Sequence, residues 1–209
     1  MNSQPLKNLF TQPDAWSGGF FEFTFELPQE SKSLANVVLA KLWSAPTLNG
    51  CYLKRDIEPD QQEKLSPTEF PNEGHWYGVA NLPNGKQSCC GTVWTEYEND
   101  GYWITFYLPL GSLANSYNIG SYPFKAEKQG VSSWMIEVNN WLVNIARLIH
   151  PVAKFELGII GFEVDYFEVK KQLEKGLPNE RWDGVLIAKD KVLEWLPPTI
   201  YNSPHVIHR

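Results

Sequence analysis

The most regular alternation of hydrophobic and polar positions lies near the start of the chain, in FFEFTFEL at residues 20–27. A period of two places successive side chains of a strand on opposite faces. Four large apolar residues alternate here with three polar ones: Phe21, Phe23, Phe25 and Leu27 against Glu22, Thr24 and Glu26. The pattern predicts a strand with one buried face.

Two segments instead repeat their apolar residues at steps of three and four, which is typical of amphipathic helices. The first runs from about residue 33 to residue 44 and is followed by Pro46. The second is SSWMIEVNNWLVNIARLIHP, with an apolar face that contains Trp134 and Trp141, and we expect Pro151 to end it. These are the two main helices that the sequence predicts.

The remaining periodic segments read as strands and turns. Residues 155–164 are apolar on both faces at their middle, as in a central strand, and Asp165 can cap a short helix that Gly176 ends. The other expected elements are a weak strand at residues 51–57, a polar loop at 58–74, a meander from 75 to 111 and a last hairpin around 189–191.

Taken together, the elements predict an α+β fold with a largely antiparallel sheet and the two main helices packed on one face. A length of 209 residues fits a single domain, with loosely held ends at 1–15 and 198–209. TFELPQESKSLAN and TFYLPLGSLAN form a faint internal repeat. They suggest two halves, 19–98 and 101–196, each built as strand, helix, strand, strand.

Charge and composition exclude several classes of function. The net charge is −6 and no basic cluster is present, so we expect no binding to nucleic acid, which requires neutralised phosphates. The first residues do not resemble a signal peptide and no apolar run is long enough to span a bilayer. These features predict a cytoplasmic protein with no membrane partner. The three cysteines, an odd number, fit that compartment, because a disulfide framework would need an even number.

The aromatic hairpin SCCGTVWTEYENDGYWITFYLPLG offers the main candidate binding site. If its loop has an even length, one face carries a set of rings and acids: Trp94, Glu96, Trp103 and Tyr107. Such a face could hold a flat or cationic ligand through stacking and cation–π attraction. Alternatively, a helix covers these rings as core, and an odd loop length would reverse the assignment of faces.

Catalytic and metal-binding motifs are missing from the sequence. There is no nucleophile elbow, phosphate loop, dinucleotide fingerprint or zinc helix. Cys89 and Cys90 are adjacent, so a strand would point them to opposite faces and they could not chelate one ion. We therefore expect no metal and no cofactor, and the only catalytic candidates are Glu163 and His75 as acid or base.

The sequence thus favours a non-enzymatic binding protein that holds a small molecule or a protein partner on an aromatic face or in a concavity. One alternative is a hydrolase-like enzyme of unrecognised class that uses Glu163 or His75 in the same cavity. Another is an acidic protein-interaction module, which the charge of −6 permits.

Overall fold

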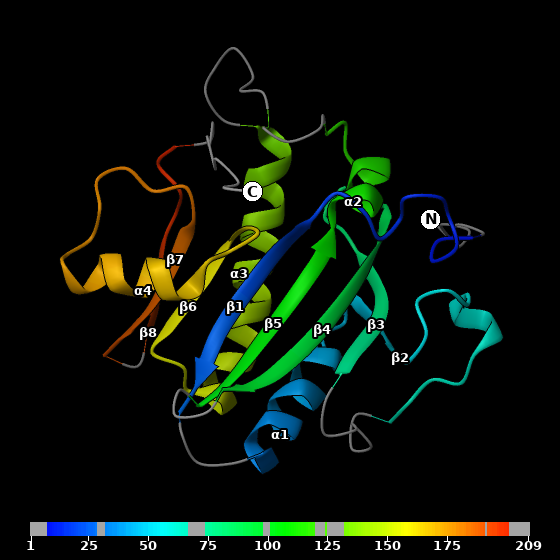
Figure 1. Cartoon of the computed structure of the whole chain (residues 1–209), viewed down its shortest axis with the longest axis horizontal. Coiled ribbons are helices and arrows are strands. Elements are labelled where there is room, and N and C mark those ends of the chain that lie inside the picture. Colours follow the sequence, from blue (N-terminus) through cyan, green and yellow to red (C-terminus); the bar gives the residue numbers. More distant parts are fainter. Residues whose placement is uncertain are drawn as a thin grey trace.

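A computed structural model describes residues 8–28, 32–66, 74–97, 101–119, 124, 132–190 and 192–200. The described strands form one eight-stranded antiparallel sheet in the order β2-β3-β4-β5-β1-β6-β7-β8 (Figure 1). Their bounds are β1 Phe20–Leu27, β2 Leu48–Tyr52, β3 Gly74–Asn81, β4 Gln87–Tyr97, β5 Gly101–Pro109, β6 Leu157–Phe162, β7 Gly184–Lys189 and β8 Val192–Leu196. The α+β class and the antiparallel sheet are confirmed.

One face of the sheet, the helix face, packs against α1 (Lys32–Trp43) and α3 (Ser133–Ala153), which lie behind the strands in Figure 1. The apolar row of β1 points into this layer, and Phe23 and Phe25 are fully buried there. The sequence alternation therefore predicted the correct buried face of β1. Burial of such large rings gives this layer the main hydrophobic stabilisation of the fold.

The opposite face, the outer face, is covered at two places. On one side, α4 (Tyr166–Glu174) packs on a cluster that contains Trp103 and Ile159. On the other side, residues 8–15, which the sequence assigned to a loose end, pack on β3 and β4 through Phe10. The buried Glu58 carboxylate holds this N-terminal segment by accepting hydrogen bonds from the Phe10 and Thr11 backbone N–H groups, at 3.2 and 2.7 Å.

The predicted helices are present, with one correction. α1 agrees with the expected helix at residues 33–44 within a residue. Pro151 does not end α3, because it lies inside the helix, which continues to Ala153 and closes with Lys154 in the left-handed conformation at φ 50°. A proline removes only one helical hydrogen bond, and Pro151 lies so near the end that the helix is completed by its C-cap.

The strand predictions from residue 155 onward also agree with the structure. β6 lies between β1 and β7, as expected of a strand that is apolar on both faces. The Asp165 side chain accepts a hydrogen bond from the Glu168 backbone N–H at 3.0 Å and caps α4, as predicted. β7 and β8 form the last hairpin, with Lys189 opposite Val192.

The faces expected for the aromatic hairpin are wrong. Tyr97 pairs with Gly101, so three residues connect β4 to β5, and this odd number reverses the assignment of faces. Trp94 lies opposite Ile104, whereas Trp103 lies opposite Thr95. The connecting residues 98–100 lie outside the described part of the chain.

Two further expectations concern the cysteines and the repeat. Cys89 and Cys90 point to opposite faces, as predicted, and both are buried free thiols. In the repeat, each copy forms a strand followed by a helix, β1 with α1 and β5 with α2 (Leu110–Ser116). After α1 the chain enters the sheet at its edge with β2 and moves inward to β5, whereas after α3 it enters beside β1 with β6 and moves outward to β8. The duplication stays a prediction.

Within the described ranges, no helix combines the length and the apolar character that a transmembrane span needs.

Candidate functional site

The four residues of the predicted binding face are divided between the two sides of the sheet. Trp94 is 4% exposed and belongs to the core on the helix face. Glu96, on the same face, is exposed and accepts a hydrogen bond from the Tyr102 hydroxyl at 3.3 Å. Trp103 and Tyr107 lie on the outer face instead. Trp94 and Glu96 are therefore neighbours on the helix face, where both contact Tyr102, and they form no joint site with Trp103 and Tyr107.

The two outer-face rings have separate surroundings. Trp103 is 5% exposed and lies under α4, with its ring centroid 3.8 Å from that of Tyr166. Tyr107 is buried and its hydroxyl lies 2.9 Å from Nδ1 of His75, one of the two catalytic candidates. A helix thus covers Trp103, whereas Tyr107 belongs to a more open part of the outer face.

Glu163, the other catalytic candidate, holds the backbone in place. It follows β6 at φ 49°, and its Oε1 accepts a hydrogen bond from the Phe20 backbone N–H at 2.7 Å. Gly19 lies beneath this carboxylate, where a β-carbon would contact Glu163 Oε1 at 2.6 Å. Among the described residues, no hydrogen bond or ion pair joins Glu163 to His75, so the two candidates do not form a pair.

Two carboxyl groups that the sequence analysis did not select lie beside Glu163. Glu22 of β1 is in register with Gly161 of β6 on the outer face, and Asp183 immediately precedes β7. Gly161 has no side chain, and the Asp183 carboxylate occupies the space where its β-carbon would lie. The absence of a side chain at Gly161 therefore leaves the two acids facing each other across β6.

Burial changes the ionisation of both acids. Desolvation, opposed by the hydrogen bond that Glu22 Oε1 accepts from the Val164 backbone N–H at 2.7 Å, raises the pKa of Glu22 to about 8. Repulsion from Glu163 and Asp183 adds to this rise. Desolvation and then the Asp165 charge raise the pKa of Asp183 to about 7. Near neutral pH, both groups are therefore easily switched between the charged and neutral forms.

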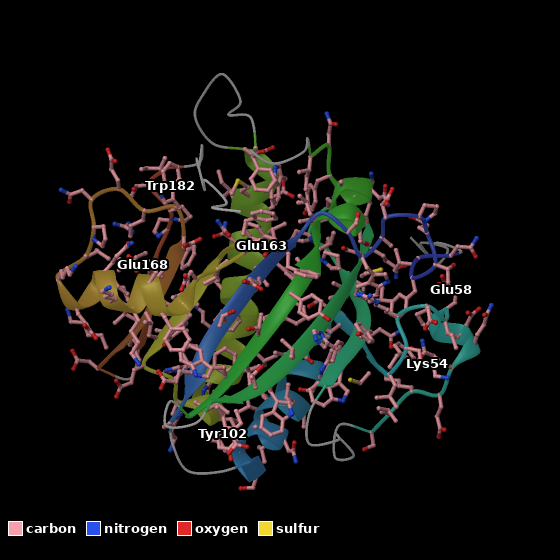
Figure 2. All side chains as sticks on the ribbon, in the orientation of Figure 1. Lys54, Glu58, Tyr102, Glu163, Glu168 and Trp182 are labelled. Carbon is pink, nitrogen blue, oxygen red and sulfur yellow. The ribbon has the colours of Figure 1, made fainter. Side chains whose placement is uncertain are left out.

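Asp183 also borders a pocket between α4 and the chain that leads into β7. The pocket has a volume of about 300 Å³. Its acidic members are Asp165, Glu168, Glu180 and Asp183, and its apolar members include Val169, Leu173, Trp182 and Val185. Figure 2 shows Glu168 and Trp182 on the side of the molecule where α4 lies, with Glu163 at the turn after β6. We call this cavity the α4 pocket.

Arg181, the one cation among the described residues that line the α4 pocket, does not neutralise its acids. Arg181 donates through Nη1 to the Pro178 carbonyl at 2.7 Å and through Nη2 to the Pro197 carbonyl at 3.0 Å. Within the described ranges, the single ion pair joins Lys170 and Glu26, and the Asp183 carboxylate has neither an ion pair nor a hydrogen bond. The pocket thus presents an acid that has no partner among the described residues.

A signal for this site exists in the sequence but is weak. Gly161 interrupts the apolar strand segment GIIGFEV, and glycine inside a strand often marks a close approach by another side chain. Which side chain approaches depends on β7, about twenty residues later, and on the register of the sheet. Among the described residues, no group of three or more His, Cys, Asp or Glu side chains is arranged to hold a metal ion.

Comparisons of the chain with protein-family models, with curated proteins and with solved structures found no match.

Proposed function

We propose that this protein is a non-enzymatic binding module whose α4 pocket holds a cationic group with an apolar body, such as an amine or a guanidinium. The observation that carries the proposal is the Asp183 carboxylate, which borders the pocket without an ion pair or hydrogen bond in the described part of the chain. A bound cation would supply the missing partner, and the apolar wall would bury the rest of the ligand.

The charge distribution supports a cation over an anion. The described lining of the pocket contains four acids and one cation, Arg181, which is held by two backbone carbonyls. Coulomb attraction inside a partly desolvated pocket is much stronger than in water. Trp182 adds an aromatic surface against which an amine or a guanidinium could pack.

The chemistry fits both a small amine and a lysine or arginine side chain of a protein partner. A titration with agmatine and with a short arginine-containing peptide distinguishes these sources. We expect saturable binding of at least one probe, with Asp183→Asn weakening it at least about tenfold, because a charge-assisted hydrogen bond is lost. Glu194→Gln on β8 removes an exposed acid outside the pocket and should leave binding unchanged.

Asp183→Asn does not endanger the fold, because it removes a charge that is unfavourable in its desolvated position. Since the pKa of Asp183 is raised to about 7, cation affinity should increase as the pH rises through that value. Equal affinity in the wild type and in Asp183→Asn would contradict the proposal, as would binding that does not depend on pH.

A hydrolase-like enzyme is the second candidate, and the raised pKa values of Glu22 and Asp183 favour it. A carboxylic acid that is partly protonated near neutral pH can serve as a general acid. Turnover of chromogenic esters or glycosides that Asp183→Asn abolishes would support this function. An acidic protein-interaction module is the third candidate, and the peptide titration at increasing salt concentration tests it.

A further inference from the structure

A continuous row of aromatic rings crosses the outer face on the side away from α4. It runs from Trp16 through Tyr77, His75 and Tyr107 to Phe20, with centroid separations of 5.1, 6.1, 5.8 and 4.9 Å. Trp16 directly follows the N-terminal segment, and the other rings come from strands β3, β5 and β1. We call these five side chains the aromatic row, and within it His75 is exposed while Tyr77, Phe20 and Trp16 are half-buried.

Gly91 makes the middle of the row possible. It lies on β4 between β3 and β5, and a β-carbon at this position would collide with the ring and hydroxyl of Tyr107. The Tyr107 side chain therefore reaches across β4 to His75 on β3, where the hydroxyl and Nδ1 are 2.9 Å apart. This contact fixes the orientation of the imidazole.

The hydrogen bond also decides which groups of the row can donate to a ligand. Desolvation raises the pKa of Tyr107, so its hydroxyl keeps its proton, and desolvation together with Arg55 lowers the pKa of His75, so its imidazole is neutral. In the tautomer of His75 that carries its proton on Nε2, the Tyr107 hydroxyl donates to Nδ1. In this tautomer His75 offers Nε2–H as a donor.

Two further donors lie near the same place. The Arg55 backbone carbonyl accepts a hydrogen bond from the Trp16 indole N–H at 3.1 Å, which fixes Arg55 beside the row. The Arg55 charge is close enough to affect the ionisation of His75, Tyr77 and Tyr107. The Tyr77 hydroxyl has no hydrogen bond within the described ranges. Asp56 is the acid that acts on this group, and it affects Tyr77 alone among the row.

We propose that the aromatic row is a second binding site, distinct from the α4 pocket, and that it takes an aromatic carboxylate. The Arg55 guanidinium, the Tyr77 hydroxyl and His75 Nε2–H would hold the carboxylate, and the rings would stack with the flat body of the ligand. Arginine suits this role because its planar fork binds carboxylates through two parallel hydrogen bonds. The proposal is independent of the α4 pocket, since no described residue belongs to both sites.

Benzoate is the probe, and the readout is the two-dimensional NMR spectrum of the full chain labelled with nitrogen-15. We expect saturable shifts at the amides of β3 and β4, which carry His75, Tyr77 and Gly91. Arg55→Gln should raise the dissociation constant about tenfold, because a charge-assisted hydrogen bond is lost. Tyr77→Phe keeps the ring and loses the donor, so it should weaken binding by a smaller factor.

Three controls test whether the position of the arginine, the negative charge of the ligand and the flat ring of the ligand each matter. Arg147→Gln removes an equal charge from the exposed side of α3, across the sheet from the row, and should leave the affinity unchanged. Benzamide tests the need for a negative charge, and cyclohexanecarboxylate tests the need for a flat ring. Both should bind more weakly than benzoate.

The proposal is overturned if benzoate produces no saturable shifts in β3 and β4, or if its shifts map to the α4 pocket. It is equally overturned if Arg55→Gln binds benzoate as tightly as the wild type, or if benzamide matches benzoate. All the substituted side chains are exposed or half-buried, and an unchanged spectrum of the free variant shows that it is folded.

Discussion

Glu22→Gln provides the sharpest test of the two acids, Glu22 and Asp183, that face each other across Gly161. Glutamine keeps an oxygen that can accept from the Val164 N–H, which bonds to Glu22 Oε1 at 2.7 Å, but it cannot ionise. The folded protein holds the pKa of Glu22 at about 8, against an ordinary value of 4.5. Ionisation of Glu22 therefore favours the unfolded chain.

The sign and size follow from linkage between protonation and folding. The stability that the protonated carboxyl contributes is fully present below the unfolded pKa of 4.5 and is lost as the pH rises through the folded pKa of about 8. At about 1.36 kcal/mol per pKa unit, the full loss is roughly 3–5 kcal/mol. Asp183 is present in both proteins, so its own titration largely cancels in the comparison.

Urea unfolding followed by circular dichroism at about pH 5 and about pH 9 measures this difference. We expect the stability of Glu22→Gln to lie within about 1 kcal/mol of the wild type at the lower pH and to exceed it by several kcal/mol at the higher pH. Glu194→Gln, the removal of an exposed strand acid, is the matched control. The reasoning would be refuted if Glu22→Gln and the wild type differed in stability by the same amount at both pH values, or if Glu22→Gln were the less stable protein at the higher pH.

Two other predictions concern packing and capping. Trp94→Ala and Trp103→Ala should each lower the free energy of unfolding by about 3–5 kcal/mol, because both rings are buried on their respective faces. Val192→Ala at an exposed position serves as control, and unfolding midpoints near the wild type would instead favour a ligand-facing role for the tryptophans. Asp165→Ala should lower the free energy of unfolding by about 1 kcal/mol and speed hydrogen exchange in the first turn of α4. Asp165→Asn keeps a side-chain oxygen that can cap the helix and serves as the control. Equal exchange rates in the two variants would argue against capping.

The candidate sites show where sequence reasoning reached its limit. Tyr107 and His75 were both singled out from the sequence, yet their hydrogen bond could not be foreseen, since it crosses β4 at Gly91. Trp94 and Trp103 were assigned to one face on the assumption of an even loop. The connection has three residues, so the two side chains lie on opposite faces of the sheet. A single residue in a loop length reverses every side chain of a strand, and no periodicity within the strands records it.

The sequence by itself determined the elements whose signal is local. The alternation in β1, the helical spacing of α1 and α3, the cap at Asp165 and the opposite directions of Cys89 and Cys90 depend only on neighbours within a few residues. Such patterns hold in any tertiary context that buries the apolar side.

Only the tertiary structure decided which distant residues share a site. Glu22 and Asp183 are about 160 positions apart in the chain, and they meet because β1, β6 and β7 are neighbours in the sheet and Gly161 leaves room between them. Their altered pKa values come from desolvation, which exists only once the surrounding strands and α4 have excluded water. Burial and register are properties of the folded sheet, so Glu22 and Asp183 acquire their chemistry from the fold.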